Sequence, residues 1–148
     1  MSIHRHWTRA ILGGVIGTLV MTAVGVWVAP MMGIPRMNPA EMLAGQMGGS
    51  LPIGWMAHLM IGTILAIGYA LVAPWIPGPP FVRGALYAVA PFLMAQLAAM
   101  PMMGMPVFSG SVPMAMGSLI GHLIYGAIVG AVYGQVDNAA SGRQPVRA

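Results

Sequence analysis

Four long apolar runs, separated by stretches rich in Gly and Pro, dominate the pattern of hydrophobic and polar positions. They cover residues 10–29, 52–73, 81–100 and 113–136. Each is close to the roughly 20 residues that a helix needs to cross the hydrocarbon core of a bilayer. Period-two alternation is missing from all four runs, and lipid tolerates no unpaired backbone. The pattern therefore predicts an all-α membrane protein with four transmembrane helices.

Composition supports a lipid environment. Hydrophobic residues make up 58% of the 148 residues and charged residues 5%, whereas soluble domains carry roughly 25% charged residues. The chain has no Cys, which excludes disulfides, thiolate metal sites and Cys nucleophiles. The first apolar run is longer than the roughly 7–15 residues of a signal-peptide core, so we expect it to be retained as a helix.

The positions of the Arg residues predict the orientation. Five of the six lie near the two termini and the 74–80 link, and the sixth lies on the other side of the predicted helices: Arg5, Arg9, Arg83, Arg143 and Arg147 against Arg36. Short cytoplasmic loops are enriched in Lys and Arg, so both termini should be cytoplasmic. Six scattered Arg residues do not form the clustered basic face that nucleic-acid binding requires.

The first outward link contains a helix signal. Asn38 can cap a helix whose first residue is Pro39, with Glu41 as the acid of a capping box. Gly45, Gly48 and Gly49 should end it. We expect a short helix on the membrane surface, with Glu41 serving as its cap.

The chain also carries an internal repeat. Pro30-Met31-Met32-Gly33-Ile34-Pro35 follows the first helix and Pro101-Met102-Met103-Gly104-Met105-Pro106 follows the third. At an offset of 64 residues, the identical pairs in the second and fourth helices include His58/His122, Leu59/Leu123, Gly62/Gly126 and Tyr69/Tyr133. The sequence predicts two duplicated helical hairpins, about 9–73 and 83–136, related as a parallel repeat, and a flexible cytoplasmic tail at 137–148.

His58 and His122 lie on helix faces of small residues spaced by four. These faces comprise Gly54, Gly62 and Ala66 in the second helix and Ser118, Gly126 and Gly130 in the fourth. Small-xxx-small faces allow membrane helices to pack closely, so both His side chains should point into the bundle. Ionisable residues inside a membrane are costly and are candidates for function.

Several roles are open to the histidine pair. The simplest is structural: each ring could bond to Ser118, Thr63 or a loop carbonyl and hold two helices together. A haem b could lie between His58 and His122 as axial ligands. Copper could bind both rings and nearby thioethers, for which Met56 and Met60 are candidates. A proton path would need acidic partners, and the predicted spans contain none.

No catalytic constellation appears. Glu41 and Asp137, the only acids, are predicted on opposite sides of the membrane, so we expect a non-enzymatic protein.

Four segments carry a resemblance: Gly13-Gly14-x-x-Gly17-Thr18, Pro30-Met31-Met32-Gly33, Gly54-Trp55-x-x-His58, and the stretch from His122 to Gly134. In these the chain resembles a family of small uncharacterised bacterial four-helix membrane proteins. The resemblance implies a multi-pass protein of the bacterial inner membrane and no particular activity. We expect a binding or accessory subunit that contacts the lipid bilayer and another membrane protein or a second copy of itself. The alternatives are a purely structural assembly partner and a small transporter.

Overall fold

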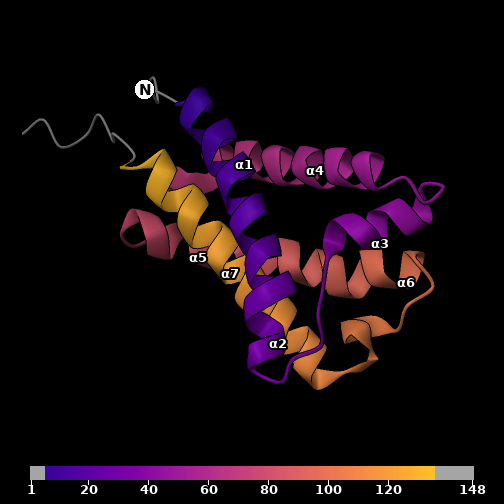
Figure 1. The fold of residues 1–148 in the computed structure, drawn as a ribbon. Coiled ribbons are helices and arrows are strands. Elements are labelled where there is room, and N and C mark those ends of the chain that lie inside the picture. The colour runs from indigo at the N-terminus through magenta and orange to yellow at the C-terminus, as the bar shows by residue number, and fades with distance from the viewer. Residues whose placement is uncertain (1–5, 136–148) are drawn as a thin grey trace, which may run out of the picture.

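The computed structural model describes residues 6–135, and all regular elements in that range are helical (Figure 1). Four helical stretches are long and apolar enough to cross a membrane: Trp7–Met31, Leu51–Trp75, Pro80–Met102 and Val112–Tyr133. The prediction of four such helices is confirmed. The last one ends before the predicted residue 136, because Gly134 takes a φ of 84°. Arg5, Asp137, Arg143, Arg147 and the predicted tail lie outside the described residues.

The first and third stretches have the same internal construction. The first consists of α1 (Trp7–Ala23), the π-helical turn η1 (Val24–Val28) and α2 (Ala29–Met31). The third consists of α5 (Pro80–Met94), the π-helical turn η3 (Ala95–Ala99) and α6 (Met100–Met102). The other elements are α3 (Pro39–Gln46), α4 (Leu51–Val72), the 3₁₀ turns η2 (Ala73–Trp75) and η4 (Val107–Gly110), and α7 (Val112–Tyr133).

Proline explains the π-helical turns, and glycine explains how the helices end. Pro30 and Pro101 have no N–H to donate to the carbonyl four residues earlier, and their rings crowd that carbonyl. The preceding turn widens in both helices. Gly33 and Gly104 then take φ values of 75° and 76°, a conformation that glycine adopts without strain. In both turns the N–H groups of the glycine and of the next residue donate to carbonyls of the last helical turn, the paired cap that ends many helices.

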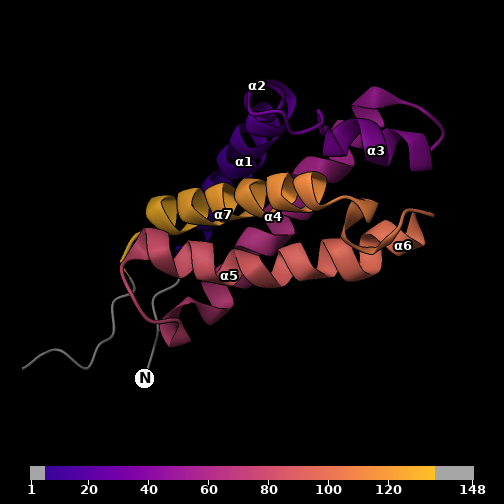
Figure 2. The same cartoon turned by 90° about the horizontal axis from the view of Figure 1, so that it is seen from below.

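The helices pack in the order α4, α1, α7, α5. α1 packs on both α4 and α7, and α5 packs on α7, whereas α4 and α5 make few contacts. Figure 1 accordingly shows α4 and α5 as separate helices, with α4 above α5 in this view. Figure 2 shows α5 and α7 lying side by side. The elements α3 and α6 lie together at one end of the bundle, here called the long-link end.

Glycine lets α5 and α7 approach almost backbone to backbone. A Cβ placed on Gly126 would overlap the Gly84 carbonyl oxygen and lie 2.5 Å from Ala88 Cβ. A Cβ on Gly62 of α4 would instead overlap a side chain, that of Thr18 in α1. Such a close approach brings many atoms of the two helices into van der Waals contact, which stabilises their packing.

The predicted Asn38 cap of α3 is present, but Glu41 pairs with Arg36 in place of the predicted capping-box bond. Asn38 Oδ1 accepts hydrogen bonds from the N–H groups of Ala40 (3.0 Å) and Glu41 (3.4 Å). The Glu41 carboxylate forms a two-pronged ion pair with Arg36, at 2.7 and 2.8 Å. This bond and the charge of Arg36 lower the pKa of Glu41. α3 packs on α4 where Gly54 leaves room.

Candidate functional site

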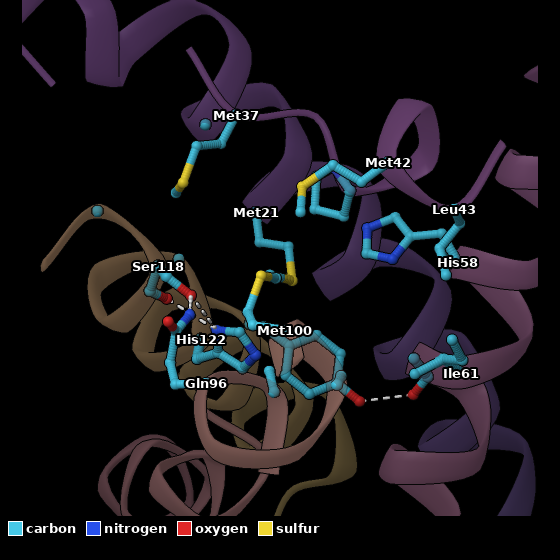
Figure 3. A pocket seen from close by; sticks show the side chains of 18 of the residues that line it. Met21, Met37, Met42, Leu43, His58, Ile61, Gln96, Met100, Ser118 and His122 are labelled. Atoms are coloured by element: carbon cyan, nitrogen blue, oxygen red, sulfur yellow. Dashed lines mark hydrogen bonds between the residues drawn. The ribbon is translucent and has the colours of Figure 1, made fainter. Parts of the chain in front are cut away.

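A partly open cavity of about 200 Å³ lies between the helices toward the long-link end. Its walls come from α1, α3, α4, η3, α7 and the links, and both predicted histidines line it. The lining is largely apolar and rich in methionine: Met21, Met37, Met42, Met100, Met103 and Met114. Figure 3 shows Met21 and Met100 projecting into the space between His58 and His122. The structure thus brings the two histidines to one cavity.

His58 is held by a neighbouring helix. Its side chain is buried, and Nε2 lies 2.9 Å from Thr22 Oγ1 of α1. Thr22 has one hydroxyl hydrogen, which it donates to the Thr18 carbonyl at 2.8 Å. The arrangement that satisfies both contacts has His58 Nε2–H donating to Thr22. His58 Nδ1 then carries a lone pair.

His122 is held by its own helix. Its Nδ1 lies 2.8 Å from the backbone carbonyl of Ser118. A carbonyl only accepts hydrogen bonds, so Nδ1 carries the hydrogen and His122 Nε2 carries a lone pair. Phe92 of α5 packs edge-on against the ring, with centroids 5.8 Å apart.

The second nitrogen of each ring is unpaired, and both rings line the cavity. Among the described residues, neither His58 Nδ1 nor His122 Nε2 has a hydrogen-bond partner. In the same part of the chain, the only fully buried side-chain nitrogen or oxygen without a partner is Arg83 Nη1. The two free imidazole nitrogens are therefore accessible from the space that both residues line. The cavity offers two hydrogen-bond acceptors in an apolar surrounding.

A chain of polar side chains supports the α7 wall. Ser109 donates to Gln96 Oε1 at 3.1 Å, and Gln96 Nε2 donates to Ser118 Oγ at 2.9 Å. Gln96 is buried in the π-helical turn η3. Tyr125 closes the cavity floor by donating to the Gly62 carbonyl at 2.5 Å. Because these groups satisfy one another, the imidazoles are the main polar groups left for a ligand.

The structure does not support the predicted metal set. Met56 and Met60 are 70% and 59% exposed and do not line the cavity. They lie two residues before and after His58, which places them on another face of the helix. Residues 6–135 contain no group of three or more His, Cys, Asp or Glu that could hold a metal ion, and the histidines do not form a metal-binding pair.

A haem does not fit the cavity. Sites for drug-sized ligands occupy roughly 300–1,000 Å³, and the cavity measures about 200 Å³, too little for a macrocycle. His58 Nε2, the nitrogen that reaches furthest from the backbone, is also engaged by Thr22. The haem hypothesis therefore finds no support in the site.

The predicted small-residue faces occupy different contacts. Gly62 and Ala66 of α4 meet α1, and Gly126 and Gly130 of α7 meet α5. Gly54 meets the short helix α3 instead of a long one. Ser118 acts through its hydrogen bonds to Gln96 and to His122.

A family model matches residues 4–144, which is nearly the whole chain. The chain belongs to DUF6789, a family of unknown function. Neither a curated protein nor a solved structure matches it. Membership in DUF6789 supports the expectation of an uncharacterised domain and assigns no ligand to the cavity.

Sequence reasoning missed several residues of this DUF6789 site. Thr22 was available as a hydroxyl inside an apolar helix, one turn after Thr18. Gln96 was visible as the one amide in its run. Met37 and Met42 could not be placed, because they reach the cavity only when the first long link folds back over α1 and α4.

Proposed function

We propose that this chain is a small, non-enzymatic membrane subunit that binds a ligand in the cavity between His58 and His122. One observation carries the proposal. Two histidines from matching sequence positions reach the same cavity, and each has one nitrogen fixed by the protein and one left free. A purely structural histidine needs only the bonded nitrogen. A histidine that binds a ligand needs a bonded nitrogen to orient the ring and a free one for the ligand.

We further propose that the four helices span a bacterial inner membrane with both termini in the cytoplasm. Large apolar side chains are exposed along all four helices, which suits lipid. Arg9 and Arg83 lie in the first turns of α1 and α5, whereas Arg36 lies in the link that follows α2, which agrees with the charge rule for cytoplasmic loops. In this orientation α3 would lie on the surface of the inner membrane that faces away from the cytoplasm.

The proposal includes the duplication of a helical hairpin. Three matched features support it: a π-helical turn before each Pro-Met-Met-Gly segment, the same cap at Gly33 and Gly104, and the two histidines at one cavity. Tyr69 and Tyr133, another matched pair, also touch, with ring centroids 5.5 Å apart. The alternative of a structural partner subunit loses one argument, because the predicted Gly faces are occupied within the chain.

The test is to identify what the purified protein retains. Wild type and the variants His58→Ala, His122→Ala and the double variant are isolated in mild detergent. Bound small molecules are extracted for mass spectrometry, and an absorption spectrum and metal analysis are recorded. A ligand shared by both rings should be lost in either single variant, and the double should add little. Met60→Ala, an exposed change on the same helix, is the control and should retain the ligand.

A contrary result is well defined. If wild type retains nothing, and the stability costs of the two single variants simply add, the histidines are structural and the binding proposal fails.

A further inference from the structure

The free imidazole nitrogens define what the cavity can recognise. Both carry lone pairs, and neither has a hydrogen to donate into the cavity once Thr22 and Ser118 are satisfied. A ligand that brings two hydrogen-bond donors would pair both. A ligand with only acceptors would leave four lone pairs facing one another, which costs free energy in an apolar site.

The residues that line the cavity also restrict the charge of the ligand. Among residues 6–135 no Asp, Glu, Lys or Arg lines the cavity. An ion placed there would lose its hydration without gaining a counter-charge, which is unfavourable. The ligand is therefore neutral.

Volume and sulfur favour an aromatic ring. An apolar cavity of about 150 Å³ accommodates benzene, and this cavity holds about 200 Å³, enough for one substituted ring. Thioether sulfur makes favourable contacts with ring edges, and Met21 and Met100 project between the histidines (Figure 3). The Tyr125 ring adds an aromatic surface to the floor.

The walls also indicate a route of entry. Ile61 and Leu65 of α4 line one side of the cavity, and Ala95 and Ala99 of η3 line the other. α4 and α5 make few contacts, and Ile61, which lines the cavity, is 41% exposed. A route through the gap between α4 and α5 would lead from the cavity to lipid.

We propose that the cavity takes the head group of a membrane-dissolved hydroquinone, a neutral aromatic ring whose hydroxyls donate to His58 Nδ1 and His122 Nε2 while its tail leaves between α4 and α5. This inference rests on the proposed function, because it names the class of ligand for the same cavity. It predicts a preference for the reduced, hydroxylated form over the oxidised form.

The test uses decyl hydroquinone, its dimethyl ether and decyl benzoquinone, which share one tail. Binding to the full chain in lipid nanodiscs is measured without oxygen, with empty nanodiscs as the blank. Loss of two hydrogen bonds should weaken the dimethyl ether and the benzoquinone by about tenfold or more. His58→Phe and His122→Phe should each reduce hydroquinone binding and abolish the preference.

The route has its own matched pair of variants. Ala99→Leu fills the gap between α4 and α5 and should weaken hydroquinone binding, whereas Ala98→Leu, on the exposed face beside it, should not. Equal weakening by both variants would overturn the lateral route.

The remaining outcomes separate the two proposals. If all three probes bind equally and the His variants weaken them equally, the cavity binds ligands but the hydroquinone assignment is wrong. Stoichiometric binding of Cu(I) that displaces the hydroquinone would also overturn the assignment. If no probe binds and the wild type retains no molecule of its own, both proposals fail.

Discussion

The two halves of the chain hold matching histidines in different ways. His58 reaches across to the Thr22 side chain of α1, whereas His122 bonds to a carbonyl of its own helix. The reason lies in the first helix of each half, α1 and α5. Aligned on Pro30 and Pro101, Thr22 corresponds to Leu93, which offers no hydroxyl. The two histidines thus occupy matching sequence positions and line one cavity, while the residues beside each ring determine which nitrogen is bonded.

A second difference concerns the π-helical turns. In the first, Gly25 lets the long link cross directly over the helix, and Met37 N–H donates to the Gly25 carbonyl at 3.1 Å. In the second, the corresponding residue is Gln96, whose side chain bonds to Ser109 and Ser118. The first half closes the cavity with the backbone of the long link, and the second half closes it with the Gln96 side chain. The two walls of the site therefore differ.

The largest expected effect distinguishes the helix contacts of the two halves. Gly126→Ala should destabilise the protein by about 1–3 kcal/mol, because the new Cβ meets the rigid backbone at Gly84 and the methyl of Ala88. Gly62→Ala should cost less, since the obstacle is the Thr18 hydroxyl and not rigid backbone, although relieving the overlap costs Thr18 its hydrogen bond to the Gly14 carbonyl. Unfolding in detergent measures both.

Gly45→Ala is the control for these variants. No atom lies within 4 Å of the added Cβ, and the residue is inside α3. It should be neutral or stabilise by up to about 1 kcal/mol through helix propensity. Equal costs for Gly62→Ala and Gly126→Ala would mean that the two contacts are equivalent after all.

The next effect tests the two histidine bonds. Wild type should show opposite tautomers in ¹⁵N NMR, with hydrogen on Nε2 of His58 and on Nδ1 of His122. Thr22→Val should remove the fixed tautomer of His58, leave His122 unchanged and cost about 1 kcal/mol. Thr63→Val, a hydroxyl on α4 away from these bonds, should change neither signal. Identical tautomers in the wild type would refute the assignment.

The smallest effect concerns an ion pair that only the first long link has. Arg36 lowers the pKa of Glu41, so the pair stabilises the folded state above the usual carboxylate range. That contribution is lost as the pH falls through the lowered pKa of the folded state. The stability difference between wild type and Glu41→Gln should therefore shrink on acidification. It should also shrink in high salt, because the pair is exposed.

The sequence predicted the helices well because their signal is local. Length and apolarity located four spans, and Asn38 with Pro39 marked the start of α3. The repeat offset brought attention to His58 and His122, which do line one cavity. It could not show how that cavity is closed, because this depends on contacts between distant segments.

The failures follow from the same limit. Met56 and Met60 were chosen for nearness in sequence, yet a separation of two residues places them around the helix from His58. Thr22 lies 36 residues before His58, and no periodicity links them. The partner of His58 could be found only after α1 and α4 were packed together.

The packing order α4, α1, α7, α5 has a mechanical consequence. The four helices form an open row with α1 packed against α7 in the middle. The outer helices α4 and α5 are here called the α4 and α5 covers. In the α5 cover, glycine brings two backbones together, which makes it stiff. The α4 cover carries α3 with it and meets α1 both at Gly14 and through the Thr18 side chain, so less of its contact is backbone on backbone. Swelling of the cavity would therefore displace α4 and α3 and leave α5 in place, so a spin-label pair spanning α4 and α5 would report occupancy.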